Sequence, residues 1–556
     1  MPRPATYDAF LALEPEAVQT LADELVNRPL SADTIDAWLR DWASMGVLFQ
    51  ESLARLDVAS SVNTADEDAA QRAEQFRATI GPIGMRMGSH LRARLLEHEH
   101  LLPDSLALAV ERIKADGRLN QSDEAIDLLN EETRLVADYF TRTGARTIEW
   151  AGKTYTSRQA MGLLEHPDRT VREGVWRAWH ALIGADRDAL AAIWRDLLDV
   201  RDRLAHANGF DDYLAYRWHE MERRDYTPAD ARALHGIMLD EWSPAVQRQM
   251  QSLRADLNVD TLRPWDVHAA TGDPLKPYTD SADFIARTSR LFHRMHPAFG
   301  ADFDRTVALG FIDLAERPNT AQVGGFSRAI GRSGAYVFMN LSGTRVDAEY
   351  LVHEMGHSFA MIESCKQPYH LTWGTSYDFS ETPSSVMEIL SMPYWGEYYA
   401  AADLPRAYRD SMRNTMHASL EETRSDAFQH WAYTHPQEAR DADACDARWL
   451  DLQRQYFPEE DWTGLERDAS GLWQDYLTFY MPLFKMEYTY GRVAGLRLLH
   501  QIQTDPDAAI ARYRHAIGLG RTVTTRDAFA ALDTRFPLQR EDVQQAIQTA
   551  ETLLST

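Results

Sequence analysis

The sequence predicts a mostly α-helical protein that folds into two lobes. Long segments, such as residues 170–209 and 227–257, repeat apolar side chains every three or four positions between Thr, Asp, Pro and Gly residues, a pattern typical of amphipathic helices. The chain of 556 residues is longer than one hydrophobic core usually serves, so we expect two or more lobes, or one large helical body with a deep cleft. No short-period repeat occurs, which argues against a regular solenoid.

The clearest candidate for a domain boundary lies near residues 142–161. Gly, Thr and β-forming residues interrupt two long helical regions there. We therefore expect an N-terminal helical lobe over residues 1–150 and a second body, which carries the motifs described below, over residues 151–556.

Charge and composition narrow the possible partners. The chain has 84 acidic and 58 basic side chains, and its formal net charge of -26 argues against nucleic acid or an anionic membrane as a partner. The N-terminus lacks the pattern of a secretory signal, and no window of about 18 uninterrupted apolar residues occurs. Cys365 and Cys445 are the only cysteines, which suits a reducing compartment. We expect a soluble cytoplasmic protein.

Residues 324–347 predict a small β-sheet directly before the main motif. Glycines stand at the bends, and the run AYVFMN at residues 335–340 is typical of a strand. If this strand is an exposed edge, the main chain at Ala335, Tyr336 and Val337 could hold an extended peptide by hydrogen bonds. Alternatively, the sheet only supports the helix that follows.

The sequence HEMGHSF predicts a metal site on that helix. The helix is expected to begin at Thr344, because Asp347 three residues later completes a pattern like a capping box. His353 and His357 are four residues apart, so both imidazoles project from one face and can bind one ion. Glu354 points about 100 degrees away, so it is better placed to contact water at the ion than the ion itself.

This set of side chains suits amide hydrolysis with zinc. Zinc lowers the pKa of water and polarises the scissile carbonyl, while Glu354 takes the water proton and passes it to the leaving amine. We therefore expect one Zn²⁺ per chain. The similar letters HEMER begin at His219 but place Arg223 where the second His should be. A cation there would repel a metal, so His219 is not expected to be a ligand.

A catalytic zinc needs a third protein ligand and an open position. Glu381 lies 24 residues after His357, in the expected first turn of a second helix, and we assign it to the metal. Glu388 returns to the same face seven residues later and is expected to accept a hydrogen bond from a ligand imidazole. Gly356 would let the two helices approach closely.

HEMGHSF followed by YDFSETPSSVMEIL resembles the oligoendopeptidase F and thimet oligopeptidase family of zinc peptidases. Segments such as VFMNLSGTRVDAEYLVHEMGH, GFIDLAERPNTAQVGGF and LRPWD also resemble the family, over roughly residues 120–500. The resemblance implies His353, His357 and Glu381 as zinc ligands and Glu354 as general base. It also implies a two-lobed helical zincin fold whose deep channel admits short unstructured peptides, and hence a zinc metalloendopeptidase that cuts oligopeptides internally.

The downstream substrate-binding motif departs from this family. Members commonly have a His followed by closely spaced Tyr residues, whereas the corresponding segment WQDYLTFYMPLFKMEYTYGRVAGL contains no His. Tyr488 and Tyr490 are the candidates to stabilise the oxyanion. Tyr476, Tyr480, Phe484 and Tyr488 also recur at fourfold spacing, which is typical of a buried aromatic stripe. Tyr480 is a further candidate for contact with the substrate.

The loop between the two expected metal helices contains His370 and Tyr377. A loop in this position could close over a bound substrate. We therefore expect His370 and Tyr377 to contact substrate.

Two other functions stay open. A dipeptidyl carboxypeptidase-like zinc peptidase would share the motif but needs a cationic group for the substrate carboxylate, which the sequence does not identify. The chain could also be a peptide-binding protein with impaired turnover, although Glu354 would then have no use.

Overall fold

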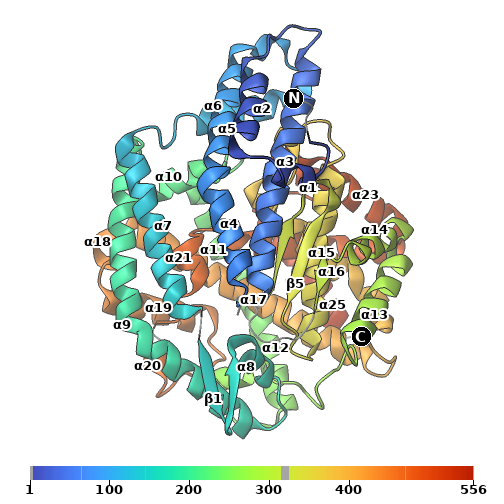
Figure 1. The fold of residues 1–556 in the computed structure, drawn as a ribbon. Coiled ribbons are helices and arrows are strands. Elements are labelled where there is room, and N and C mark those ends of the chain that lie inside the picture. The colour runs from blue at the N-terminus through green and yellow to red at the C-terminus, as the bar shows by residue number, and fades with distance from the viewer. Residues whose placement is uncertain (1–3, 64, 145, 315–324, 470, 555–556) are drawn as a thin grey trace.

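The computed structural model describes residues 4–63, 65–144, 146–314, 325–469 and 471–554. Helices dominate this part of the chain, and two small sheets interrupt them (Figure 1). The predicted mostly helical fold is confirmed. Most of the segment GFIDLAERPNTAQVGGF, one of those used for the family resemblance, lies outside the described residues.

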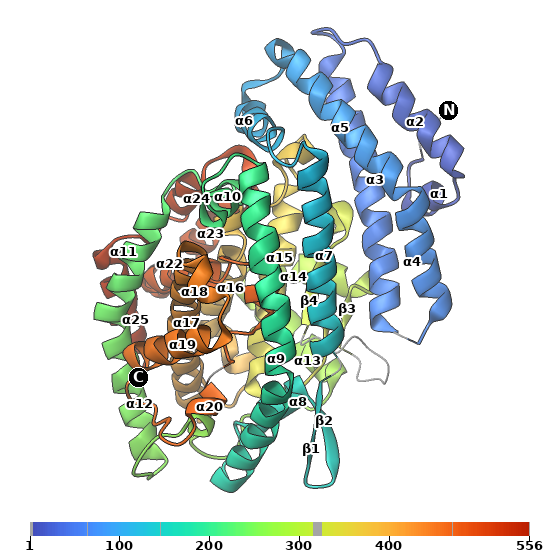
Figure 2. The same ribbon diagram turned by 90° about the vertical axis from the view of Figure 1, so that its left-hand side faces the viewer.

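The first part of the chain forms a helical lobe with its own core. Buried side chains from Phe10 to Ile113 form one cluster, which Tyr369 joins from the rest of the chain. Figure 2 shows that helices α1 to α5 stand to one side of the other helices. The helices of this lobe are α1 (Tyr7–Leu11), α2 (Pro15–Asn27), α3 (Ile35–Val62), α4 (Glu67–Thr79), α5 (Gly81–Glu97), η1 (Glu99–Leu101), η2 (Asp104–Leu106) and α6 (Ala107–Asp116).

A second, larger core extends from Leu119 to Ala550. Helix α7 (Asp123–Thr143) packs against α9 (Arg169–Ala207) in this core. The two cores therefore separate before α7, earlier in the chain than the boundary predicted near residue 150. The reason is that α7 buries Leu128, Leu135 and Tyr139 on its apolar face, and α9 covers them.

The remaining helices complete the larger body. They are α8 (Ser157–Leu163), α10 (Tyr213–Glu220), α11 (Pro228–Ile237), η3 (Met238–Trp242), α12 (Ser243–Asp256), η4 (Pro264–Asp266), α13 (Ser281–Met295), α14 (Pro297–Ala308), η5 (Gly331–Ser333), α15 (Arg345–Ser364), η6 (His370–Thr372), η7 (Tyr377–Phe379), α16 (Thr382–Ser391), η8 (Met392–Glu397), α17 (Leu404–Thr434), α18 (Pro436–Ala439), α19 (Ala442–Tyr456), α20 (Glu466–Ala469), α21 (Tyr476–Tyr480), α22 (Met486–Thr504), α23 (Pro506–Gly518), η9 (Gly520–Thr522), α24 (Thr525–Ala531) and α25 (Arg540–Leu554).

A small sheet lies beside α15, as predicted, but its strand order differs from the expectation. Strands β3 (Ile312–Asp313), β4 (Gly325–Ala329) and β5 (Ala335–Met339) form the order β3-β5-β4. Strand β5 pairs antiparallel with β4 and parallel with β3, so it is the central strand. The prediction that Ala335, Tyr336 and Val337 form an exposed edge strand is therefore wrong. The turn after β4 folds that strand back along β5 and places β4 at an edge. A separate hairpin joins β1 (Thr147–Trp150) and β2 (Lys153–Thr156).

The start of α15 is predicted correctly, but its capping differs in detail. The helix begins at Arg345 after Thr344, whose side chain makes no capping bond. The carboxylate of Asp347 instead accepts hydrogen bonds from the amides of Ser342 and Gly343, at 2.8 and 2.7 Å. Asp347 thus holds the loop between β5 and α15 in place.

Among the described residues, no helix is both long enough and apolar enough to cross a membrane. Cys365 and Cys445 are buried, and neither is in a disulfide. Burial raises the pKa of each thiol to about 12, so neither thiol is an activated nucleophile.

Candidate active site

Helices α15 and α16 bring three predicted metal ligands to one point. His353 and His357 project from the same face of α15, and Glu381 lies directly before the first residue of α16. The Nε2 atoms of both imidazoles lie 3.3 Å from Oε2 of Glu381. All three ligand atoms lie within 4.8 Å of one another, so one ion could contact them together.

Two glycines, which have no side chain, let α15 and α22 approach α16 closely enough for the three side chains to converge. A Cβ atom at Gly356 of α15 would lie 2.5 Å from the Cα atom of Ser384 on α16. On the other side of α16, a Cβ atom at Gly491 of α22 would lie 2.9 Å from the Cα atom of Thr382. Both distances are shorter than packed atoms allow, so helix α16 is held between two glycine contacts.

Glu388 orients one of the imidazoles. Its Oε1 atom lies 2.6 Å from Nδ1 of His353, on the opposite side of the ring from Glu381. A carboxylate at this position fixes the ring and leaves Nε2 free to bind a metal. The structure thus contains the hydrogen bond between an imidazole and Glu388 that the sequence predicted.

The charges within the cluster are strongly coupled. Burial by itself lowers the pKa of His353, but hydrogen bonds to Glu381 and Glu388 outweigh this effect and raise that pKa to about 10. Burial raises the pKa of Glu381, but His357 and His353 outweigh it and hold this pKa well below its ordinary value. Glu381 is therefore an ionised ligand, and a metal would compete with a proton for His353.

Glu354 lies beside the ligands on α15 and is 5% exposed. Tyr476, at the start of α21, also faces this region. Burial raises the pKa of Tyr476 to about 12, and the charges of Asp475, Glu381, Glu422 and Glu354 raise it in the same direction. Its side chain nevertheless remains about half exposed, at 51%. Tyr476 is thus partly exposed and interacts electrostatically with Glu381 and Glu354, a placement that the sequence reasoning missed.

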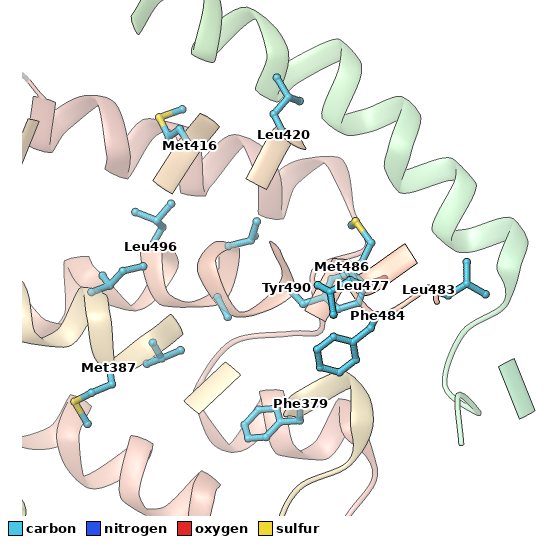
Figure 3. Close-up of a cluster of buried hydrophobic side chains, with 14 of the residues drawn as sticks. Phe379, Met387, Met416, Leu420, Leu477, Leu483, Phe484, Met486, Tyr490 and Leu496 are labelled. Carbon is cyan, nitrogen blue, oxygen red and sulfur yellow. The ribbon is translucent and has the colours of Figure 1, made fainter. Parts of the chain in front are cut away.

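The two Tyr residues proposed for the oxyanion differ sharply. The ring of Tyr488 stacks with that of His353, with centroids 6.2 Å apart and an interplanar angle of 19°. Tyr490 is 1% exposed, and its hydroxyl donates to that of Tyr226 at 3.4 Å. Figure 3 shows Tyr490 among buried apolar side chains such as Leu477 and Met486. The structure therefore brings Tyr488 to the cluster but places Tyr490 in the core.

The predicted aromatic stripe does not form one helical face. Helix α21 ends at Tyr480, and α22 begins only at Met486. The fourfold spacing of Tyr476, Tyr480, Phe484 and Tyr488 therefore crosses a break between two helices. Tyr480 is 52% exposed, and its ring packs edge-on against Phe140 of α7.

A cavity of about 410 Å³ lies next to the metal helix. Met361, four residues after His357 on α15, lines it together with Ala329 at the end of β4. His370 lines the same cavity, and its ring contacts Trp42 of the N-terminal lobe with centroids 5.2 Å apart. Burial lowers the pKa of His370 to about 4, so the ring is neutral near pH 7.

The cavity also contains basic groups from two distant segments. Arg112 of α6 and Arg521 of η9 both line it, together with Glu222. Arg521 is in an ion pair with Glu222, and Arg112 donates to the carbonyl of Arg521 at 2.9 Å. Tyr377 is 39% exposed and is not among the residues that line this cavity.

Arg223, in the segment HEMER, has a structural position. Its guanidinium is 2.9 Å from Asp378 and 2.5 Å from Glu487, and all three side chains are buried. This ion-pair network joins the segment after α10 to η7 and α22.

The described residues combine a mostly helical fold with a cluster of two His and one Glu on adjoining helices that could hold a metal ion. The model of Peptidase family M3 matches residues 162–548. The chain therefore belongs to peptidase family M3. A search of the curated proteins gives no significant match.

Several solved structures share the fold. Pz peptidase A with an inhibitor is 19% identical, with a TM-score of 0.86, and the match covers 98% of this chain and 97% of that one. A candidate oligoendopeptidase F is 20% identical over the same shares of both chains, with a TM-score of 0.87. Oligoendopeptidase F from Enterococcus faecium is 14% identical, with a TM-score of 0.62, over 99% of this chain and 98% of that one. At these identities the likeness establishes the fold alone.

Proposed function

We propose that this M3 peptidase is a zinc-dependent oligoendopeptidase that hydrolyses internal bonds of short unstructured peptides. The observation that carries the proposal is the convergence of His353, His357 and Glu381 at one point. Two neutral nitrogens and one carboxylate oxygen are a ligand set that zinc uses in hydrolytic sites with an open fourth position. When bound there, zinc would supply Lewis acidity.

The residues around the metal divide the remaining work. Glu354 takes a proton from the attacking water, whose oxygen bonds to the scissile carbonyl carbon. The same proton then passes to the leaving amine as the C–N bond breaks. Tyr488 donates a hydrogen bond to the oxygen that becomes negative, a role worth roughly 3 kcal/mol for a well-aimed donor. Glu388 holds the ring of His353 in register.

Strand β4 is the better candidate for binding the peptide main chain. It is an edge strand of the described sheet, whereas β5 pairs on both sides. An extended peptide could add to such an edge by main-chain hydrogen bonds. Because Ala329 at the end of β4 lines the cavity, one end of the peptide would enter that cavity and meet His370.

Because the cavity contains basic groups, a carboxypeptidase activity is the second candidate function. Arg112 and Arg521 could meet a free C-terminal carboxylate, the group that such an enzyme must recognise. Glu222 already compensates part of this charge through its ion pair with Arg521. We therefore favour internal cleavage.

A digest of a mixed peptide library, read by mass spectrometry with and without a chelator, tests the proposal. We expect chelator-sensitive cuts inside peptides that are blocked at both ends, and no cuts in folded proteins. Loss of cleavage on C-terminal blocking would favour the carboxypeptidase instead. The variant Glu381→Ala should lose metal and activity together, and full zinc occupancy in this variant would refute the third ligand.

A further inference from the structure

A second group of metal-ligand side chains lies away from the active site. His235 comes from α11, and Asp426 and His430 lie four residues apart on α17, on one face of that helix. Oδ2 of Asp426 is 2.7 Å from Nε2 of His235 and 3.4 Å from Nε2 of His430. One ligand atom from each side chain lies within 4.8 Å of the other two.

This cluster contains buried polar atoms without partners. In the part of the chain that the structure describes, neither ring nitrogen of His430 has a hydrogen-bond partner, and Oδ1 of Asp426 has none either. His430 is 3% exposed and Asp426 is 2% exposed, so solvent does not replace the missing partners. An unpaired buried donor or acceptor destabilises the folded protein. The Nε2 atom of His430 lies 3.4 Å from Oδ2 of Asp426 without forming a hydrogen bond to it.

Charged groups around this cluster include the guanidinium groups of Arg223 and Arg232. Arg223 is the guanidinium within the ion-pair network of Asp378 and Glu487, and it also interacts with Asp426. Arg223 thus interacts with three buried acidic side chains. Because Asp378 and Glu487 hold Arg223, its charge opposes a metal at Asp426 only weakly.

We propose that His235, Asp426 and His430 bind a second divalent cation of the zinc class, which joins α11 to α17. Two imidazoles and one carboxylate match the ligand preference of zinc. The cation would bond to the unpaired nitrogen of His430 and balance the buried carboxylates. Because all three ligands are buried and the ring of Trp218 packs against His430, at 5.9 Å between centroids, the site has a structural role.

Metal stoichiometry tests this proposal directly. The full-length protein is stripped with a chelator, reloaded with excess Zn²⁺, desalted and measured by mass spectrometry of its metal content. We expect two equivalents in the wild type, one in His430→Ala and one in the double variant His353→Ala/His357→Ala. His435→Ala, at the end of the same helix, is the matched control and should keep two. No zinc in the double variant, or two equivalents in His430→Ala, would overturn the proposal.

Thermal unfolding gives a second readout that does not depend on activity. In the double variant His353→Ala/His357→Ala, added Zn²⁺ should raise Tm, because only the second site can bind it. Adding the milder changes Asp426→Asn or His430→Gln should abolish that rise even if the alanine variant fails to fold. A double variant whose Tm does not respond to Zn²⁺ contradicts the second site. This measurement leaves the proposed peptidase activity untested, so the two proposals fail independently.

Discussion

Two clusters in this protein have the same ligand types in opposite surroundings. The rings of His353 and His357 lie 5.0 Å apart at 83°, and those of His235 and His430 lie 5.1 Å apart at 88°. Each pair is completed by one carboxylate. The side chain of His357 is 25% exposed, whereas no ligand side chain of the second cluster exceeds 9%. Similar ligand geometry therefore does not by itself define a catalytic centre.

The neighbours of each cluster make the difference. The first has Glu354 beside it on α15, and Met361 of the same helix lines a cavity. The second is covered by Trp218 and lies in the larger core, with no route for a peptide among the contacts described. Access for substrate and a free base together turn a metal site into a hydrolytic site.

The largest expected effect comes from replacing Glu354, because this residue lies beside the first cluster only. Glu354→Gln keeps the side-chain shape but removes the proton acceptor, so hydrolysis should fall by about 10²–10⁴-fold while metal content is unchanged. Turnover of an end-blocked fluorogenic peptide and metal analysis measure both quantities. Glu363→Gln, on the same helix but paired with Arg514, is the control and should retain activity. Wild-type turnover in purified Glu354→Gln would rule out the assigned base.

The next largest effect is expected from Tyr488 and Tyr490 on α22, whose replacement should affect kcat and stability differently. Tyr488→Phe should lower kcat by about 10²-fold, equivalent to roughly 3 kcal/mol, because one donor to the oxyanion is lost. Tyr490→Phe should leave kcat nearly unchanged but lower stability by about 1 kcal/mol, since it loses the hydrogen bond to Tyr226. Steady-state kinetics and urea unfolding on both variants make the comparison. Equal losses of kcat would contradict the assignment of Tyr488 alone.

The close contact between α15 and α16 at Gly356 should affect both the stability of the protein and zinc binding at the first cluster. Gly356→Ala would force α15 away from Ser384, so we expect the free energy of unfolding to fall by about 1–3 kcal/mol and zinc affinity to weaken. Gly184→Ala in α9 is the control, because no neighbouring group lies within 4 Å of the place that its new methyl group would take. This control should be neutral or more stable by up to about 1 kcal/mol. Equal stability of the two variants would show that α15 and α16 can separate freely.

The pH dependence of zinc affinity should also differ between the clusters. The pKa of His353 is raised to about 10, so this ring is protonated below that pH when no metal is bound, and zinc must displace its proton. Affinity at the first cluster should therefore fall by about tenfold for each unit that the pH decreases between 9 and 6. The pKa of His430 is lowered to about 4, so this ring contributes no such slope. Chelator competition on His430→Ala and on His353→Ala/His357→Ala measures each site, and equal slopes would contradict the difference.

The sequence by itself determined the first cluster almost completely. Helical periodicity placed His353 and His357 on one face and Glu354 beside them, and the spacing of Glu381 and Glu388 on one helix predicted their separate contacts. These are local relations within two short segments. The helical fold and the small sheet followed from the same local patterns.

Only the tertiary structure decided the relations between distant segments. His235 meets Asp426 across 191 positions of the chain, and neither residue has a local pattern that predicts the contact. Strand β5 is central because β3 and β4 both pair with it. Tyr490 lies in the core, although Tyr488, two positions earlier, stacks with His353. Strand pairing and the rotation of a helix against its neighbours are set by burial of the whole surface, so a local sequence pattern does not contain them.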